Sequence, residues 1–174
     1  MRPETLEFIR AIRASHITPS PIVDLGGCET NRQFDSVFLD DYEVWDRRSA
    51  GDVDKTIDIT IPLPQWAVGY ASTLICIDTL EHIFDLGVAV KNLGSIVKQG
   101  GLLIVAVPFA FPEHDSSGDY WRLTNQALER LFQNDFVRVD SGYYGDKVTL
   151  YSEQWVDHCW GTMQSSSYYL GRRK

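Results

Sequence analysis

Three residues near the N-terminus, Asp24, Gly26 and Gly27, have the types and spacing of a ligand-binding turn. They end an apolar segment, where glycines let backbone N–H groups approach a ligand closely because no Cβ intervenes. Asp46 ends the next apolar segment, and a carboxylate there can accept hydrogen bonds from both hydroxyls of a ribose. Asp58 could hold an adenine amino group. This order predicts a nucleotide-type cofactor; the alternative is that Asp24 and Asp46 merely end strands and cap turns.

A second group of polar residues follows the apolar segment 73–78. Asp78 ends that segment, and Glu81 and His82 come directly after it. His82 is interpreted as a helix-capping or supporting residue. His114 follows the next apolar segment and is the candidate catalytic base, since histidine changes charge near neutral pH. The alternative is a loop histidine that hydrogen-bonds the backbone or the Asp115 and Asp119 carboxylates.

Aromatic and cationic side chains then come together at Tyr120, Trp121 and Arg122. The two rings could stack on a sugar or an aromatic acceptor, and Arg122 could pair with a phosphate or carboxylate. Alternatively Trp121 packs in the core and Arg122 forms a structural ion pair. Loop residues such as His114 and Asp119 could be imagined as metal ligands, but loop carboxylates commonly serve turns, so no metal site is predicted.

The elements that must position these residues alternate along the chain. A helix is expected over 4–14 and another over 85–98, and Thr124 is expected to cap a third. Strands are expected over 22–25, 42–46, 55–59, 73–78, 102–107 and 136–140. A further helix is expected through Val148, Trp155, Cys159 and Met163, and a last edge strand over 168–170. This alternation predicts an α/β sandwich with a mostly parallel sheet and helices on both faces.

The composition limits the function classes. At 174 residues with 44% hydrophobic residues, the chain is expected to be one domain over 1–174 with an ordinary core. A net charge of −8 disfavours nucleic acid, and the basic end of the chain, 172–174, is interpreted as a solubilising tail. Three scattered cysteines and the absence of a long apolar run predict a cytoplasmic protein with no membrane partner. The late aromatics are expected to bury against the sheet or a second subunit, so a homo-oligomer is compatible with the sequence.

These motifs, taken in order, resemble a class I S-adenosylmethionine-dependent methyltransferase of the type 11-like group. The matching pieces are Val-Asp-Leu-Gly, Asp46, Asp58, Asp-Thr-Leu-Glu-His, Gln-Gly-Gly-Leu-Leu-Ile-Val-Ala-Val-Pro-Phe and, over 119–124, Asp-Tyr-Trp-Arg-Leu-Thr. The last piece resembles a bacterial subgroup associated with sugar or polysaccharide pathways. The resemblance implies a Rossmann-like methyltransferase fold, S-adenosyl-L-methionine as cofactor and a small-molecule acceptor such as a sugar hydroxyl.

The same resemblance assigns roles to individual residues. It implies that Asp24, Gly26 and Gly27 hold the amino-acid end of the cofactor, that Asp46 and Asp58 hold its ribose and adenine, and that Asp78 lines the pocket between cofactor and substrate.

One departure from the family pattern keeps other functions open. Cys28 stands where the family's second glycine would lie. A methyltransferase-like binding or scaffold protein without catalysis is therefore the alternative. A nicotinamide-dependent oxidoreductase would need a fuller Gly-x-Gly-x-x-Gly turn, which this sequence lacks.

Overall fold

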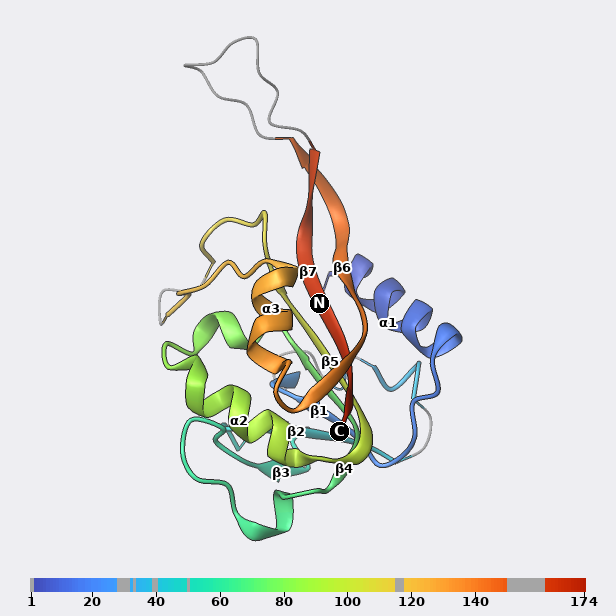
Figure 1. Ribbon diagram of the computed structural model, residues 1–174, viewed down its shortest axis with the longest axis vertical. Coiled ribbons are helices and arrows are strands. Elements are labelled where there is room, and N and C mark those ends of the chain that lie inside the picture. Colours follow the sequence, from blue (N-terminus) through green and yellow to red (C-terminus); the bar gives the residue numbers. More distant parts are fainter. Residues whose placement is uncertain are drawn as a thin grey trace.

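A seven-stranded sheet with strand order β3-β2-β1-β4-β5-β7-β6 forms the centre of the computed structural model (Figure 1). The structure describes residues 2–27, 32, 34–38, 41–49, 51–114, 118–149 and 162–174. The strands are β1 (Ile22–Leu25), β2 (Tyr42–Asp46), β3 (Lys55–Thr56), β4 (Ala71–Ile77), β5 (Val97–Pro108), β6 (Phe136–Thr149) and β7 (Thr162–Arg173). The predicted α/β class with a mostly parallel sheet is confirmed, because β1 to β5 run parallel and β7 runs antiparallel to both its neighbours.

Within the described residues, three α-helices and two short 3-10 helices flank the sheet: α1 (Pro3–Ser15), α2 (Leu86–Ile96), α3 (Asn125–Phe132), η2 (Gln65–Ala67) and η3 (Leu80–His82). The ends of the α-helices follow from the sequence. Pro3 occupies the first turn of α1, where its missing N–H costs nothing. Thr124 caps α3 as predicted, since its hydroxyl accepts a 3.1 Å hydrogen bond from the Ala127 N–H.

Alternating side chains of the sheet bury against helices on both faces. All seven residues of β4 are buried, as expected of a central parallel strand covered on both sides. One face packs with α2 and α3 through Val23, Leu25, Trp45, Leu74, Cys76, Leu103, Val105, Ala89, Leu93, Leu128 and Phe132. The other packs with α1 through Ile22, Val44, Ile75, Ile77, Leu102, Ile104, Ile9 and Ile12.

The C-terminal part of the chain differs from the sequence-based prediction. β7 is not an edge strand, because it lies between β5 and β6 and pairs with both. Val148 and Met163, expected in a helix, lie opposite each other in β6 and β7, and these two long strands extend side by side beyond the rest of the sheet (Figure 1). Trp155 and Cys159 lie outside the described residues. Arg172 and Arg173 belong to β7 rather than to a solubilising tail.

Candidate functional site

Parallel strands end at one edge of a sheet, so residues that follow β1 to β5 must gather there. Gly26 and Gly27 follow β1, Asp46 ends β2, Asp58 lies just past β3, and Asp78 follows β4. These are the positions of the sequence-predicted cofactor residues. The structure therefore brings five of the six predicted residues to the carboxyl edge of the sheet, and the sixth, Asp24, lies within β1.

The turn after β1 accepts only glycine at its first position. Gly26 has a φ of +88°, and a Cβ built on it would overlap Oγ1 of Thr79 from the loop after β4. A Cβ on Gly27 would lie 2.6 Å from Oδ2 of Asp24. The backbone of this turn is thus held close to two polar side chains, with no room for side chains of its own. Cys28 lies outside the described residues.

Asp24 is buried beneath that turn. The Tyr42 hydroxyl donates a 2.6 Å hydrogen bond to Asp24 Oδ2. Burial, followed by the negative charge of Asp24, raises the pKa of Tyr42 far above the ordinary tyrosine value, so the hydroxyl stays protonated and donates. The pair ties β1 to β2 directly under the glycine turn.

Asp46 and Asp58 each cap a local turn. The buried Asp46 accepts a 2.8 Å hydrogen bond from the Arg48 N–H at Oδ1. Asp58 Oδ1 accepts bonds of 2.8 and 2.6 Å from the N–H and hydroxyl of Thr60, whose hydroxyl bond is the main cause of a lowered pKa for Asp58. Turn capping is the structural role that the sequence left as the alternative. It coexists with a position at the strand ends where a nucleoside could lie.

Asp78 is held by the N-terminus of the chain. Its backbone is left-handed, with a φ of +49°. Arg2 donates bonds of 2.8 and 3.0 Å to its two carboxylate oxygens, and the guanidinium lies 5.1 Å from the centre of the Phe111 ring. Nothing in the sequence around Arg2 pointed to this contact, because the partner lies far away along the chain.

Glu81, in η3, carries a completely buried carboxyl group. Its exposure is 0%, and neither carboxylate oxygen has a hydrogen-bond partner among the described residues. Burial, followed by the charge of Asp78, raises the pKa of Glu81 to about 8. Buried polar groups are nearly always paired, so this carboxyl group is a candidate for a functional role.

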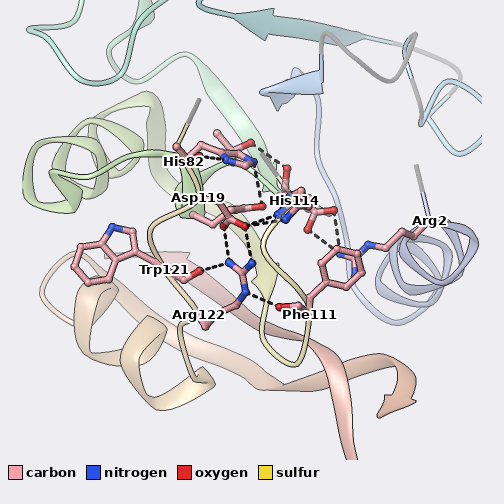
Figure 2. A network of polar contacts seen from close by, with 12 residues as sticks. Arg2, His82, Phe111, His114, Asp119, Trp121 and Arg122 are labelled. Atoms are coloured by element: carbon pink, nitrogen blue, oxygen red, sulfur yellow. Dashed lines mark hydrogen bonds and ion pairs between the residues drawn. The ribbon is translucent and has the colours of Figure 1, made fainter. Parts of the chain in front are cut away.

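Two histidines lie near this carboxyl group, His82 from η3 and His114 from the loop after β5, and Figure 2 labels both. His82 Nε2 lies 3.7 Å from Glu81 Oε1, and the rings of His82 and His114 meet edge to face at 5.2 Å between centroids. His114 Nδ1 lies 3.0 Å from Asp119 Oδ2. His114 thus contacts the Asp119 carboxylate, which the sequence analysis gave as the alternative to a role as catalytic base. The same contact orients the His114 ring toward Glu81 and His82.

Arg122 is fully engaged within the chain. Its guanidinium donates to both Asp119 oxygens and to the carbonyls of Phe111, Pro112 and Trp121, which uses all five of its N–H groups (Figure 2). The bonds to Arg122 are the main cause of a strongly lowered pKa for Asp119. The carboxylate beside His114 is therefore ionised.

The neighbouring aromatic residues differ in exposure. Trp121 is half-buried and donates a 3.0 Å bond from Nε1 to the Ile83 carbonyl. Tyr120 is 50% exposed and meets Phe84, 71% exposed, edge to face at 5.4 Å. Tyr120 and Phe84 therefore present an open aromatic surface beside the histidines.

We compared the sequence and the structure with known proteins. No protein-family model matches the sequence, and no curated protein matches it. Among solved structures, an S-adenosylmethionine dependent methyltransferase from Mesorhizobium loti matches with a TM-score of 0.59 and 12% identity, over 94% of this chain and 96% of that one. The YcgJ protein from Bacillus subtilis matches with a TM-score of 0.63 and 12% identity, over 98% of both chains. The [4+2]-cyclase SpnF matches with a TM-score of 0.61 and 15% identity, over 97% of this chain and 80% of that one.

The fold is the Rossmann-like fold of S-adenosylmethionine-dependent methyltransferases. At these sequence identities the similarity defines the fold alone. One of the matching structures, SpnF, is a [4+2]-cyclase, so the fold does not fix the reaction, which must be argued from the site. Among the described residues, no helix is long and apolar enough to cross a membrane.

Proposed function

We propose that the chain transfers a methyl group from S-adenosyl-L-methionine to a small-molecule acceptor, of which a sugar hydroxyl is the type favoured by the sequence resemblance. The observation that carries this proposal is the tight turn at Gly26 and Gly27, where Thr79 and Asp24 leave no room for a Cβ, with Asp46 at the end of β2 and Asp58 just past β3 at the same edge of the sheet. Such an arrangement suits a nucleoside with an amino-acid end.

The cofactor residues have separate tasks in this proposal. The amino-acid end lies at the turn of Gly26 and Gly27 above the buried Asp24, and the ribose and adenine lie toward Asp46 and Asp58. When bound, the cofactor supplies a methyl group on an activated carbon. The chain has to align the acceptor, exclude water and remove the hydroxyl proton.

His114 is the proposed group for proton removal. A carboxylate can only accept a hydrogen bond, so the ionised Asp119 keeps the proton of a neutral His114 on Nδ1 and the lone pair on Nε2. That lone pair can accept a proton from an acceptor placed near Tyr120. Because all N–H groups of Arg122 are engaged, we assign Arg122 to positioning Asp119 and His114, and we leave acceptor contacts to Tyr120 and the edge of Trp121.

Calorimetric titration with S-adenosylmethionine and S-adenosylhomocysteine tests the first half of this proposal. We expect both ligands to bind one site per chain. Absence of binding at millimolar ligand would reject the proposal. Methyl transfer to a panel of sugars and other hydroxyl compounds, followed by mass spectrometry, tests the second half. The variant His114→Ala should bind the cofactor normally and lose turnover.

A binding or scaffold protein without catalysis remains the second candidate. It is favoured by one observation, the ion pair between Arg2 and Asp78. Asp78 is expected to face the ligands, but its carboxylate is bound by another residue of the same chain. This candidate predicts cofactor binding without methyl transfer to any acceptor, or no cofactor binding at all.

A further inference from the structure

Glu81, His82 and His114 form a compact cluster of groups that can bind a metal ion. One potential ligand atom from each residue lies within 4.8 Å of the other two. Glu81 is the unusual member, since its carboxyl group is completely buried and without a hydrogen-bond partner among the described residues. A bound cation would pair with this carboxyl group in its ionised form and satisfy its oxygens.

The hydrogen bond of His82 fixes which ring nitrogen faces the carboxyl group. His82 Nδ1 lies 2.6 Å from the Gly118 carbonyl oxygen, which can only accept, so Nδ1 carries the proton. In the neutral ring the lone pair is then on Nε2, 3.7 Å from Glu81 Oε1. Metal-binding histidines commonly donate their second N–H to a backbone carbonyl in this way.

His114 has the other common supporting partner, a carboxylate. Its Nδ1 lies 3.0 Å from Asp119 Oδ2, and Asp119 is itself held by Arg122 at both oxygens. A carboxylate in this position fixes the ring orientation and makes the opposite nitrogen a better ligand. The two histidines therefore have their supporting contacts in place before any metal binds.

We propose that Glu81, His82 and His114 bind one divalent transition-metal ion, Zn²⁺ or a chemically similar cation. Two imidazoles and one carboxylate form a ligand set of catalytic zinc sites, which leave the fourth position for water or substrate. Tetrahedral zinc with ligands at about 2.0–2.1 Å separates neighbouring ligands by about 3.3 Å. The 3.7 Å between Glu81 Oε1 and His82 Nε2 is close to this value. Mg²⁺ and Ca²⁺ prefer sets of oxygen ligands and should bind weakly.

The metal site shares His114 with the proposed methyl transfer. Where both hold, which rests on the proposed function, His114 is occupied as a ligand. A cation held there would supply the charge that lowers the pKa of the acceptor hydroxyl in place of the imidazole, and the hydroxyl proton would pass to water.

Zn²⁺ titration of the full, untagged chain tests the proposal, followed by equilibrium dialysis and elemental analysis. Co²⁺ serves as a spectroscopic probe, because its visible absorption reports the ligand geometry. We expect one equivalent of Zn²⁺ per chain, with no displacement by excess Mg²⁺. His114→Gln should weaken Zn²⁺ binding by more than about tenfold and change the Co²⁺ spectrum, since removal of a supporting group alone costs about 10–100-fold. The matched control is His16→Gln, at the end of α1, which should bind as the wild type does.

Two results would overturn the proposal: no stoichiometric Zn²⁺ binding by the wild type, or equal affinity in His114→Gln. Because Glu81 is buried, the Glu81→Gln variant is informative only when its circular dichroism spectrum matches that of the wild type. If it does not fold, the His114→Gln variant still tests the proposal, because His114 is partly exposed. The cofactor titration is a separate readout. Failure of the methyltransferase proposal would leave Zn²⁺ binding intact, and failure of the metal proposal would leave cofactor binding intact.

Discussion

The guanidinium of Arg2 holds both carboxylate oxygens of Asp78, at 2.8 and 3.0 Å, across 76 residues of sequence. The pair joins the start of the chain to the loop after β4, the central strand of the sheet. It also places a positive charge at the edge where the proposed cofactor and acceptor meet. The N-terminus is thus a structural part of the candidate site.

Replacement of Arg2 should therefore destabilise the fold. Arg2→Gln removes two charge-assisted bonds from a partly exposed pair, and we expect a loss of about 1 kcal/mol in the free energy of unfolding. Arg2→Lys keeps the charge but cannot bond to both carboxylate oxygens in the same geometry, so its free energy of unfolding should lie between those of the wild type and Arg2→Gln. Urea denaturation measures both. Arg10→Gln, on the exposed side of α1, makes the same change in net charge and should cost less. Equal losses for Arg2→Gln and Arg10→Gln would contradict a role for the Asp78 contact.

The glycine turn can be tested with a pair of matched substitutions. Gly26→Ala adds a Cβ at a φ of +88° and against Thr79, whereas Gly100→Ala adds one at a φ of +75° with no atom within 4 Å. Both variants carry the backbone cost of about 1 kcal/mol. Only Gly26→Ala should lose more stability and also weaken S-adenosylmethionine binding. Equal unfolding free energies would show that the contact with Thr79 relaxes without cost.

Asp46 should contribute to cofactor affinity. Asp46→Ala leaves the ribose hydroxyls without an acceptor, and we expect a loss of about 1–3 kcal/mol, which is about 5- to 150-fold in Kd. Calorimetry with S-adenosylhomocysteine measures it. Asp52→Ala is the control, because it removes the same charge from a nearby exposed position. A folded Asp46→Ala variant with wild-type affinity would remove Asp46 from the site.

Tyr144 should make the protein sensitive to alkaline pH. Burial, followed by the charge of Asp78, raises its pKa from 10.0 to about 12. Below about pH 10 the hydroxyl is protonated in both states, and above it the unfolded chain loses the proton first. The free energy of unfolding should therefore fall between about pH 10 and 12. Tyr144→Phe should reduce this fall, as measured by urea denaturation across the range. An identical decline in the variant would assign the sensitivity to other groups.

Local patterns in the sequence predicted most of the sheet and the edge at which the site lies. The apolar segments that became β1, β2 and β4, the spacing of α2 and the cap at Thr124 are properties of neighbouring residues. Periodicity and capping act within a few residues, so one sequence suffices to read them. Because parallel strands end together, the grouping of Gly26, Asp46 and Asp78 at one edge followed from the same patterns.

The tertiary structure alone decided which polar groups meet there. The insertion of β7 between β5 and β6 and the bonds from Arg2 to Asp78 join segments that are far apart in the sequence. The bonds of Arg122 stay within 11 residues of it, but no local pattern assigns its donors to these acceptors. Glu81 appeared in the sequence only as an acidic residue beside a histidine. Its burial, with no hydrogen-bond partner among the described residues, and its closeness to His114 depend on how η3 packs against the loop after β5. Contacts between loops are set by the three-dimensional arrangement of the strands that carry them, and no local pattern encodes them.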